Sequence, residues 1–141
     1  MAASMADHPP VDPAAEGAGL PLCSADELAE RGQAWCWDVV EYGRPVRAFA
    51  LRFEGSVRAY LNRCAHVPTE MDWQPGQFLD SDKRYILCSI HGAAYEPAGG
   101  RCVGGPCGRG RLVSIRTAER GGMVYWYPSR SIQAVVFDDP A

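Results

Sequence analysis

Alternating hydrophobic and polar positions run through the middle of the chain and predict β-strands rather than helices. Residues 34–41 and 45–53 both alternate, so each run predicts a strand with two distinct faces. One face of the first run carries Trp35, Trp37 and Val39, and one face of the second carries Arg47, Phe49, Leu51 and Phe53. Glu54, Gly55 and Ser56 form a tight turn into the run 57–62. The second and third runs therefore predict a β-hairpin.

The alternation stops after this hairpin and returns only near the C-terminus. Residues 63–80 are irregular, residues 85–87 are a short apolar run, and residues 88–111 are rich in Gly, Cys and Arg. Regular strands are predicted again at 112–116 and 123–127, with a last edge strand over 132–137. The sequence thus predicts an all-β fold interrupted by an irregular insert, and function often resides in such inserts.

The N-terminal part predicts little regular structure. Residues 1–19 consist mainly of Ala, Pro, Gly and acidic residues, and we expect a flexible tail. Ser24-Ala-Asp-Glu27 reads as a capping box, followed by Gly32 as a stop, and predicts one short helix at most. The length of 141 residues fits one domain, expected over 20–130, with 131–141 as a C-terminal strand or tail.

Charge and composition exclude several classes of function. The chain has 14 Lys and Arg against 17 Asp and Glu, and residues 1–20 contain three acids and no base. The remainder is formally neutral, which argues against a nucleic-acid partner, because phosphate binding needs a basic face. No apolar run approaches the ~20 residues of a membrane span, so no membrane association is predicted. The N-terminus lacks a secretory pattern, and we expect a cytoplasmic protein whose six cysteines are reduced thiols or metal ligands.

The insert contains two short mixed Cys/His motifs, which we call hooks. The first is Cys64-Ala-His66 and the second is Cys88-Ser-Ile-His91, and each follows a strand-like run. Thiolate and imidazole ligands together favour Zn, Fe or Cu over Mg or Ca. A lone cysteine is usually a small buried hydrophobe and a lone histidine a satisfied polar residue. Two mixed hooks that use both histidines of the expected domain are harder to explain in that way, and they predict a metal centre.

Two kinds of centre fit these four residues. A structural zinc site accepts two Cys and two His, although zinc fingers usually pair like ligands in sequence. In a Rieske two-iron cluster one iron is held by two Cys and the other by two His, so each mixed hook supplies one ligand to each iron. The mixed hooks favour the iron cluster.

The segment resembles the Rieske [2Fe–2S] family, because both hooks, Gly92, Tyr95, Gly99-Gly100 and Gly104-Gly105-Pro106 follow one another in the family's order. The resemblance implies a β sandwich with an inserted cluster-binding subdomain at about 62–108. It implies that Cys64 and Cys88 hold a buried ferric iron, and that His66 and His91 hold an outer, reducible iron facing solvent. It also implies that Tyr95 donates to the Cys64 sulfur and that the loop containing Pro106 covers one side of the cluster.

Three positions differ from the respiratory members of this family. Those proteins place a disulfide between the hooks, but the equivalent positions here are Thr69 and Ile90. They also place a Ser that donates to a cluster sulfur where this chain has Ala93. Because a lost donor stabilises the reduced cluster less, we predict a potential in the lower half of the Rieske range of roughly −150 to +300 mV. This places the chain with the ferredoxin and oxygenase-type members.

The remaining cysteines and the arginines near the hooks have two interpretations each. Cys102 and Cys107 flank the Gly-Pro loop, and two free thiols are favoured over a disulfide or a second metal site; Cys23 and Cys36 have no partner pattern. Four arginines on or beside the insert loops are either a patch that attracts an acidic partner or a solvated face: Arg63, Arg101, Arg109 and Arg111. Of the four tryptophans, only Trp73 lies between the hooks, where it would shield the cluster; the others are expected in the core.

The shortage of histidines argues against an enzyme. A mononuclear oxygenase iron needs two histidines and a carboxylate, and after His66 and His91 only His8 remains. We therefore predict a soluble ferredoxin that carries one [2Fe–2S] cluster and passes single electrons from a reductase to a terminal acceptor such as an oxygenase. One alternative is a small subunit of a larger reductase, which would expose an apolar patch on the sandwich. Another is a structural zinc module in an interaction protein. A third is a Rieske-like fold used only for binding, but the intact set of ligands disfavours it.

Overall fold

The computed structural model describes residues 19–135, and nearly all regular structure within this range is β-strand. The strands are β1 (Leu20–Ser24), β2 (Trp35–Glu41), β3 (Arg44–Phe53), β4 (Ser56–Leu61), β5 (Ile86–Leu87), β6 (Ala94–Tyr95), β7 (Cys102–Gly104), β8 (Ser114–Arg120), β9 (Met123–Tyr127) and β10 (Ile132–Ala134). Two single-turn 3₁₀ helices are present, η1 (Ala25–Glu27) and η2 (Gly105–Cys107). The predicted all-β fold is confirmed.

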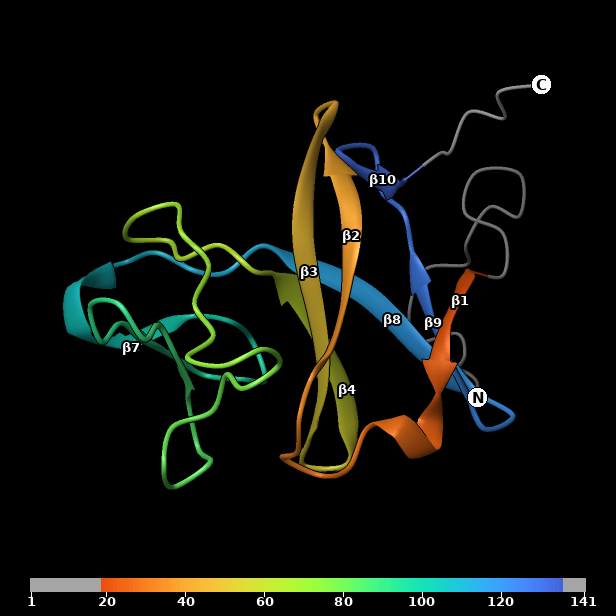
Figure 1. Ribbon diagram of the computed structural model, residues 1–141, viewed down its shortest axis with the longest axis horizontal. Coiled ribbons are helices and arrows are strands. Elements are labelled where there is room, and N and C mark those ends of the chain that lie inside the picture. Colours follow the sequence, from red (N-terminus) through yellow and green to blue (C-terminus); the bar gives the residue numbers. More distant parts are fainter. Residues whose placement is uncertain (1–18, 136–141) are drawn as a thin grey trace.

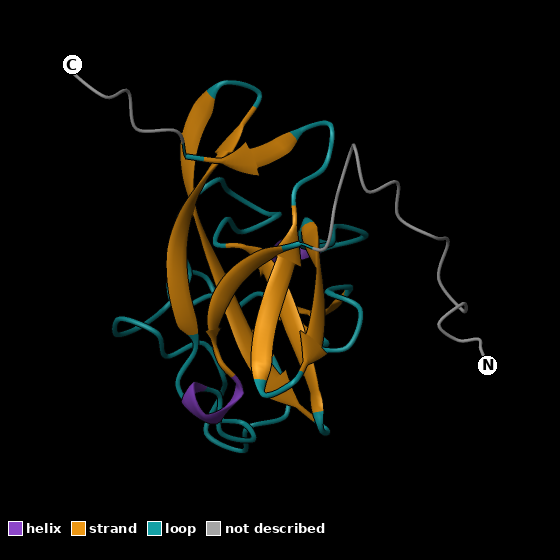
Figure 2. Ribbon diagram, turned by 90° about the vertical axis from the view of Figure 1, so that its right-hand side faces the viewer, coloured by secondary structure: helices purple, strands orange, loops and turns teal. Residues whose placement is uncertain are grey.

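The strands form two antiparallel sheets. The larger has seven strands in the order β1-β9-β8-β4-β3-β2-β10, and the smaller has three in the order β5-β6-β7. Figure 1 shows the strands of the large sheet on one side of the molecule and the chain between β4 and β8 on the other, and Figure 2 shows how the large sheet curls. The irregular insert of the sequence is thus a separate lobe that contains the small sheet.

The curled sheet closes over its own hydrophobic core, so that its two halves pack like the layers of a sandwich. Trp37 on β2 packs against Trp126 on β9, with ring centroids 5.7 Å apart, although three strands separate β2 and β9 in the sheet. Val39, Ala48 and Val124 are fully buried in the same cluster. The prediction that the face of β2 carrying Trp35, Trp37 and Val39 lies in the core is confirmed.

Strand β3 separates this core from a second one beneath the insert. Ala48 and Ala50 face the core of the curled sheet, whereas Phe49, Leu51 and Phe53 face the insert. The Phe49 ring stacks on Phe78 of the insert, with centroids 3.7 Å apart and ring planes 11° apart. The two faces predicted from the alternation therefore bury two different cores, and the large residues of β3 provide the floor on which the insert rests.

The predicted hairpin of β3 and β4 is confirmed, and its turn places both Glu54 (φ 54°) and Gly55 (φ 81°) in the left-handed region. A turn with two positive φ values matches the twist of a tight hairpin. The carboxylate of Glu30 accepts hydrogen bonds from the amides of both turn residues. Such bonds to the charged form lower the pKa of Glu30, the amide of Gly55 contributing most.

Some elements differ from the sequence prediction. Strand β1 was not predicted, because Pro21 and a register shift between Pro21 and Cys23 interrupt its alternation. Strands β6 and β7 have only two and three residues, too few for a recognisable period. The strand predicted at 112–116 begins at Ser114 and continues to Arg120. The expected short helix is a single 3₁₀ turn, in which the Ser24 side chain caps the amide of Asp26.

Residues 1–18 of the expected tail, including His8, and residues 136–141 lie outside the described range. Within residues 19–135, no helix is long and apolar enough to cross a membrane.

Candidate metal centre

The two hooks have the same backbone geometry. Cys64 follows β4 and Cys88 follows β5 directly. In each hook the cysteine amide donates to the carbonyl five residues later: Cys64 to Thr69 at 3.0 Å and Cys88 to Ala93 at 2.8 Å. Both cysteines are buried, whereas His66 and His91 lie in the exposed part of each turn. Each hook thus places its sulfur inside the insert and its imidazole at the surface.

The four side chains form two pairs. The His66 and His91 rings meet edge to face, with centroids 5.0 Å apart. The Cys64 and Cys88 side chains are within hydrogen-bonding reach of each other. Within the described part of the chain, no three Cys, His, Asp or Glu side chains gather round one point as a single bound ion would require. The pairing of imidazole with imidazole and of sulfur with sulfur is the arrangement expected for a two-iron cluster with two Cys and two His ligands.

The surroundings of the two cysteines affect their ionisation differently. Burial opposes ionisation of Cys64, but hydrogen bonds from Tyr95, from the amides of Val67 and His66 and from Cys88 outweigh it and lower the pKa of the Cys64 thiol. Burial and the neighbouring Cys64 raise the pKa of Cys88, although the amides of Ile90 and His91 favour its thiolate. Both cysteines therefore lie among backbone donors aimed at sulfur, which is a suitable environment for metal-bound thiolates.

A chain of hydrogen bonds connects the two hooks. The buried Asn62, two residues before Cys64, accepts from the Met71 amide at 2.8 Å and donates to the Asp72 carboxylate at 3.0 Å. The Met71 carbonyl in turn accepts from the amide of Ser89 in the second hook, at 3.0 Å. Asn62 is the only buried polar or charged residue among those described. The sequence did not predict this connection. The only signal for Asn62 was its position two residues before Cys64.

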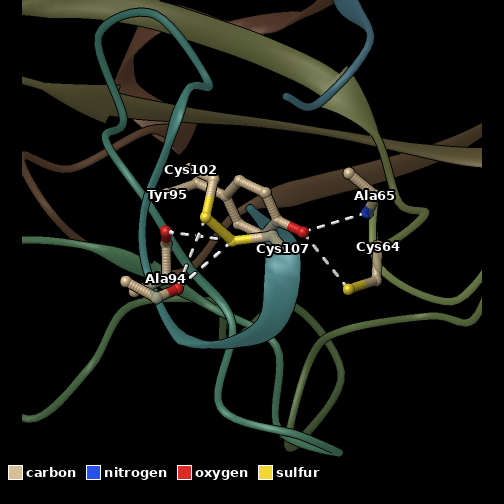
Figure 3. Close-up of a disulfide and its surroundings, with 7 residues drawn as sticks. Cys64, Ala65, Ala94, Tyr95, Cys102 and Cys107 are labelled. Atoms are coloured by element: carbon tan, nitrogen blue, oxygen red, sulfur yellow. Dashed lines mark hydrogen bonds between the residues drawn. A yellow bond between two sulfur atoms is a disulfide. The ribbon is translucent and has the colours of Figure 1, made fainter. Parts of the chain in front are cut away.

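The Tyr95 hydroxyl points at Cys64 and Ala65 of the first hook, as Figure 3 shows. The hydroxyl oxygen accepts a hydrogen bond from the Ala65 amide at 2.9 Å and lies 3.2 Å from the Cys64 Sγ. Because the amide already supplies a proton to the oxygen, the hydroxyl proton is available to the sulfur. Burial, and then the nearby Cys64, raise the pKa of Tyr95, so the hydroxyl remains protonated at neutral pH.

A third loop, residues 104–111, lies against both hooks, and glycine makes the close approach possible. A Cβ on Gly105 (φ 77°) would lie 2.5 Å from the Gly92 carbonyl oxygen of the second hook. A Cβ on Gly110 would lie 2.8 Å from the Ala65 Cβ of the first hook. Pro106, between them, is exposed at the tip of the loop. The loop thus packs against both hooks, and its role as a cover over one side of the cluster stays a prediction.

The expectation that Cys102 and Cys107 are free thiols is wrong, because they form a disulfide with a Cα–Cα distance of 5.8 Å. The Gly104-Gly105-Pro106 turn between them brings Cys102, at the start of β7, next to Cys107, at the end of η2. Figure 3 shows this disulfide close to the Ala94 and Tyr95 segment. The prediction failed because it rested on a reducing compartment rather than on local geometry. Cys23 and Cys36 are free, as expected.

The arginines near the hooks are not equivalent. Arg63 forms a two-pronged ion pair with Glu41 at the end of β2, so its charge is compensated. Arg101 pairs with Glu96 at 3.3 Å. Arg109 and Arg111 are exposed, and no ion pair with them is found in residues 19–135. Trp73 is about half exposed (53%), and its predicted shielding role stays a prediction.

Comparison with known families settles the class of this centre. A family model described as the Rieske [2Fe–2S] domain matches residues 19–127. The chain belongs to the Rieske [2Fe–2S] family. Its cofactor is therefore a [2Fe–2S] cluster, and the paired donor set of two buried thiols and two exposed imidazoles fits such a cluster. No curated protein matches the sequence significantly.

Solved structures with the same fold include proteins of an oxygenase system. The ferredoxin of carbazole 1,9a-dioxygenase from Nocardioides aromaticivorans IC177 aligns with a TM-score of 0.62 and 20% identity, over 79% of this chain and 98% of that one. A complex of reduced oxygenase and oxidised ferredoxin in carbazole 1,9a-dioxygenase aligns with a TM-score of 0.59 and 20% identity, over 77% of this chain and 91% of the matched chain. The terminal oxygenase from the same Nocardioides strain aligns with a TM-score of 0.57 and 22% identity, over 86% of this chain but 31% of its own length.

The residues that depart from the respiratory Rieske pattern have clear places in the structure. Thr69 contributes its carbonyl to the first hook, and Ile90 is 57% exposed beside His91. Ala93 is fully buried and touches the third loop at Gly105. The Rieske centre of this chain thus lacks a disulfide between its hooks and has one at the base of its third loop instead.

Proposed function

We propose that this Rieske protein is a ferredoxin that carries single electrons from a reductase to a terminal acceptor such as an oxygenase. The observation that carries the proposal is the separation of the paired ligands: sulfur lies inside the insert and both imidazoles lie at its surface. An electron that reaches the imidazole side is within reach of a docked protein. The structural similarity to ferredoxin and oxygenase chains of a dioxygenase supports the same function.

In this proposal Cys64 and Cys88 hold the inner iron, and His66 and His91 hold the outer one, within a cluster-binding subdomain of about residues 62–108. The bound cluster supplies a centre that takes up and releases one electron. Tyr95 donates its hydroxyl proton toward Cys64, and Pro106 and its neighbours exclude water from one side. The extra negative charge of the reduced state is stabilised by such donors, because a hydrogen bond strengthens as its acceptor gains charge.

The proposed function involves no bond chemistry on this chain. A mononuclear catalytic iron needs two histidines and a carboxylate, but the chain contains three histidines and the proposed ligand set uses two of them. Bond-making steps would then belong to the acceptor. Protein redox partners are therefore the expected interactors, rather than a small-molecule substrate.

Two other functions fit the structure less well. A permanent subunit of a larger reductase should expose an apolar patch on the curled sheet. The exposed large apolar residues instead lie mostly in the insert: Val67, Trp73, Tyr85, Ile90 and Val103, against Leu20, Tyr42 and Val113 elsewhere. A structural zinc site would hold all four ligands round one ion, whereas the mixed Cys/His hooks and the family match favour the two-iron cluster.

Purification of the full chain without air tests the proposal. The expected product is red-brown, contains two irons and two acid-labile sulfides per chain, and bleaches on addition of about one electron equivalent of dithionite. Cys64→Ser should abolish the colour and loosen residues 62–108, because metal binding contributes to folding. Cys36→Ser, which alters a half-buried free cysteine outside the insert, is the matched control and should keep the colour. A colourless protein with one tightly bound zinc would overturn the proposal.

A further inference from the structure

The third loop carries positive charge to the edge of the imidazole pair. Gly110 packs against Ala65, the residue between Cys64 and His66, and its two sequence neighbours are Arg109 and Arg111. Both arginines are exposed. Figure 1 places η2, at the start of this loop, at the end of the molecule opposite β1 and β9. The charged side chains are therefore attached to a loop that lies beside the proposed electron exit.

Within residues 19–135, no ion pair compensates the charge of Arg109 or Arg111. Residues 96–114 contain three arginines and a single acid, Glu96. Arg101 and Arg111 face each other in an isolated antiparallel bridge, although like charges opposite one another destabilise such a pair. Glu96 compensates Arg101 alone, and Glu41 compensates Arg63 on the other side of the first hook. Arg109 and Arg111 leave a surplus of positive charge in a chain whose overall net charge is −3.

Exposed apolar side chains flank the two histidines and the third loop in sequence. Val67 follows His66, Ile90 precedes His91, and Val103 precedes the third loop, and all three are exposed. An apolar centre with a charged rim is the usual anatomy of a protein interface. A rim of one sign orients a partner of opposite sign and raises the rate of encounter.

We propose that Arg109 and Arg111 form a basic rim that docks an acidic surface of the electron-transfer partner beside His66 and His91. This inference rests on the proposed carrier function and adds the charge of the partner's surface to it. The basic rim is small, and it adjoins exposed apolar residues. A protein surface fits both features better than a nucleic acid, whose backbone would need a longer basic track.

Electron transfer from the reduced holoprotein to small oxidants of opposite charge tests the rim. Each transfer moves one electron, converting ferricyanide to ferrocyanide or the tris(phenanthroline)cobalt(III) cation to its cobalt(II) form. At low salt, Arg109→Gln/Arg111→Gln should slow the reaction with ferricyanide by about threefold to tenfold and speed the reaction with the cobalt cation. Added salt should remove the difference. Arg130→Gln, in the turn between β9 and β10 of the large sheet, removes an exposed positive charge outside the insert and should change neither rate.

Competition with polyanions tests whether the basic rim binds an acidic protein or a nucleic acid. Poly-L-glutamate should slow the ferricyanide reaction of the wild-type protein and should have a several-fold weaker effect on the double variant. An oligothymidine of the same charge that competes more strongly than poly-L-glutamate would overturn the assignment to an acidic protein. Equal rates for wild type and the double variant with both small oxidants would overturn the basic rim but leave the carrier function standing. Failure of the wild-type protein to reduce either oxidant would instead contradict the carrier function.

Discussion

The hydroxyl of Tyr95 lies 3.2 Å from the sulfur of Cys64 and at the same time accepts the amide proton of Ala65 at 2.9 Å. This double contact fixes both the position of the oxygen and the direction of its proton. Since the tyrosine ring is fully buried, water does not compete for the contact. The hydroxyl is therefore a donor held in place before any change of charge occurs at the sulfur.

Tyr95→Phe should lower the reduction potential. The donor stabilises the more negative reduced state by about 1 kcal/mol more than the oxidised state, which for one electron corresponds to about 40 mV. Redox titration followed by visible circular dichroism would measure the shift. Tyr60→Phe is the matched control: Tyr60 is also buried, burial raises its pKa to about 12, and its hydroxyl donates to the Pro97 carbonyl rather than to a sulfur.

The control variant is expected to lose stability without a change in potential. If Tyr95→Phe and Tyr60→Phe shifted the potential equally, the effect would come from loosened packing rather than from the bond to sulfur. An unchanged potential in Tyr95→Phe would show that the hydroxyl proton does not reach Cys64.

Parts of the site that depend on local sequence could be predicted, and parts that depend on packing between distant segments could not. Each hook keeps its cysteine and histidine within a few residues, so their spacing alone pointed to a metal centre. Phe49 and Ala48 followed from the period of two in a long strand. Asn62 gave no pattern, because its role depends on Met71 and Ser89, which the fold brings to it.

Substitutions in the third loop should separate close approach from backbone strain. Gly105→Ala introduces both backbone strain and a steric clash, because the φ of Gly105 is 77° and the new Cβ would lie 2.5 Å from the Gly92 carbonyl oxygen. Gly108→Ala introduces only backbone strain, because the φ of Gly108 is 59° and no atom lies within 4 Å of the new Cβ. We expect a loss of about 1 kcal/mol for Gly108→Ala and clearly more for Gly105→Ala. Thermal loss of the visible colour would measure both variants.

Cluster release should follow the same order as stability. Gly105→Ala pushes the loop away from the second hook, so a chelator should remove iron from it faster than from Gly108→Ala. Equal rates in the two variants would mean that the loop does not depend on the contact with Gly92.

Asn62→Asp should destabilise the protein in a way that depends on pH. The new carboxylate keeps an acceptor for the Met71 amide but loses the donor to Asp72 and adds a like charge beside it. Repulsion raises the pKa of this carboxyl pair in the folded state above its unfolded value. The penalty is therefore absent when both carboxyls are protonated and grows as the pH rises through the folded pKa.

Denaturant unfolding of Asn62→Asp and Asn62→Ala at acidic and neutral pH distinguishes the causes. Asn62→Ala should cost about 1–3 kcal/mol at every pH, because it leaves the buried Met71 amide without its acceptor. Only Asn62→Asp should recover stability toward acidic pH, relative to the wild type. Parallel pH profiles for the two variants would contradict the assigned bond to Asp72.

The disulfide at the base of the third loop should determine how firmly that loop covers the centre. Cys102 and Cys107 enclose a six-residue loop, and closing such a loop contributes about 2 kcal/mol in the chain-entropy estimate. Two backbone bonds depend on it directly: the Cys102 amide donates to the Gly110 carbonyl, and the Gly110 amide donates to the Cys107 carbonyl. Cys102→Ala/Cys107→Ala should therefore speed hydrogen exchange of these two amides by up to about 30-fold.

Reduction of the disulfide by a thiol tests its effect on the loop without a substitution. Dithiothreitol reduces the disulfide to two thiols, so it should accelerate exchange at Gly110 in the wild-type protein but have no further effect in the double variant. Cys23→Ala, which truncates a buried free cysteine in the other core, controls for lost packing. The Leu61 amide, bonded to Val113 beside the large sheet, should exchange at an unchanged rate in all variants. Acceleration at Leu61 as well as Gly110 would mean that the disulfide stabilises the whole fold rather than the loop.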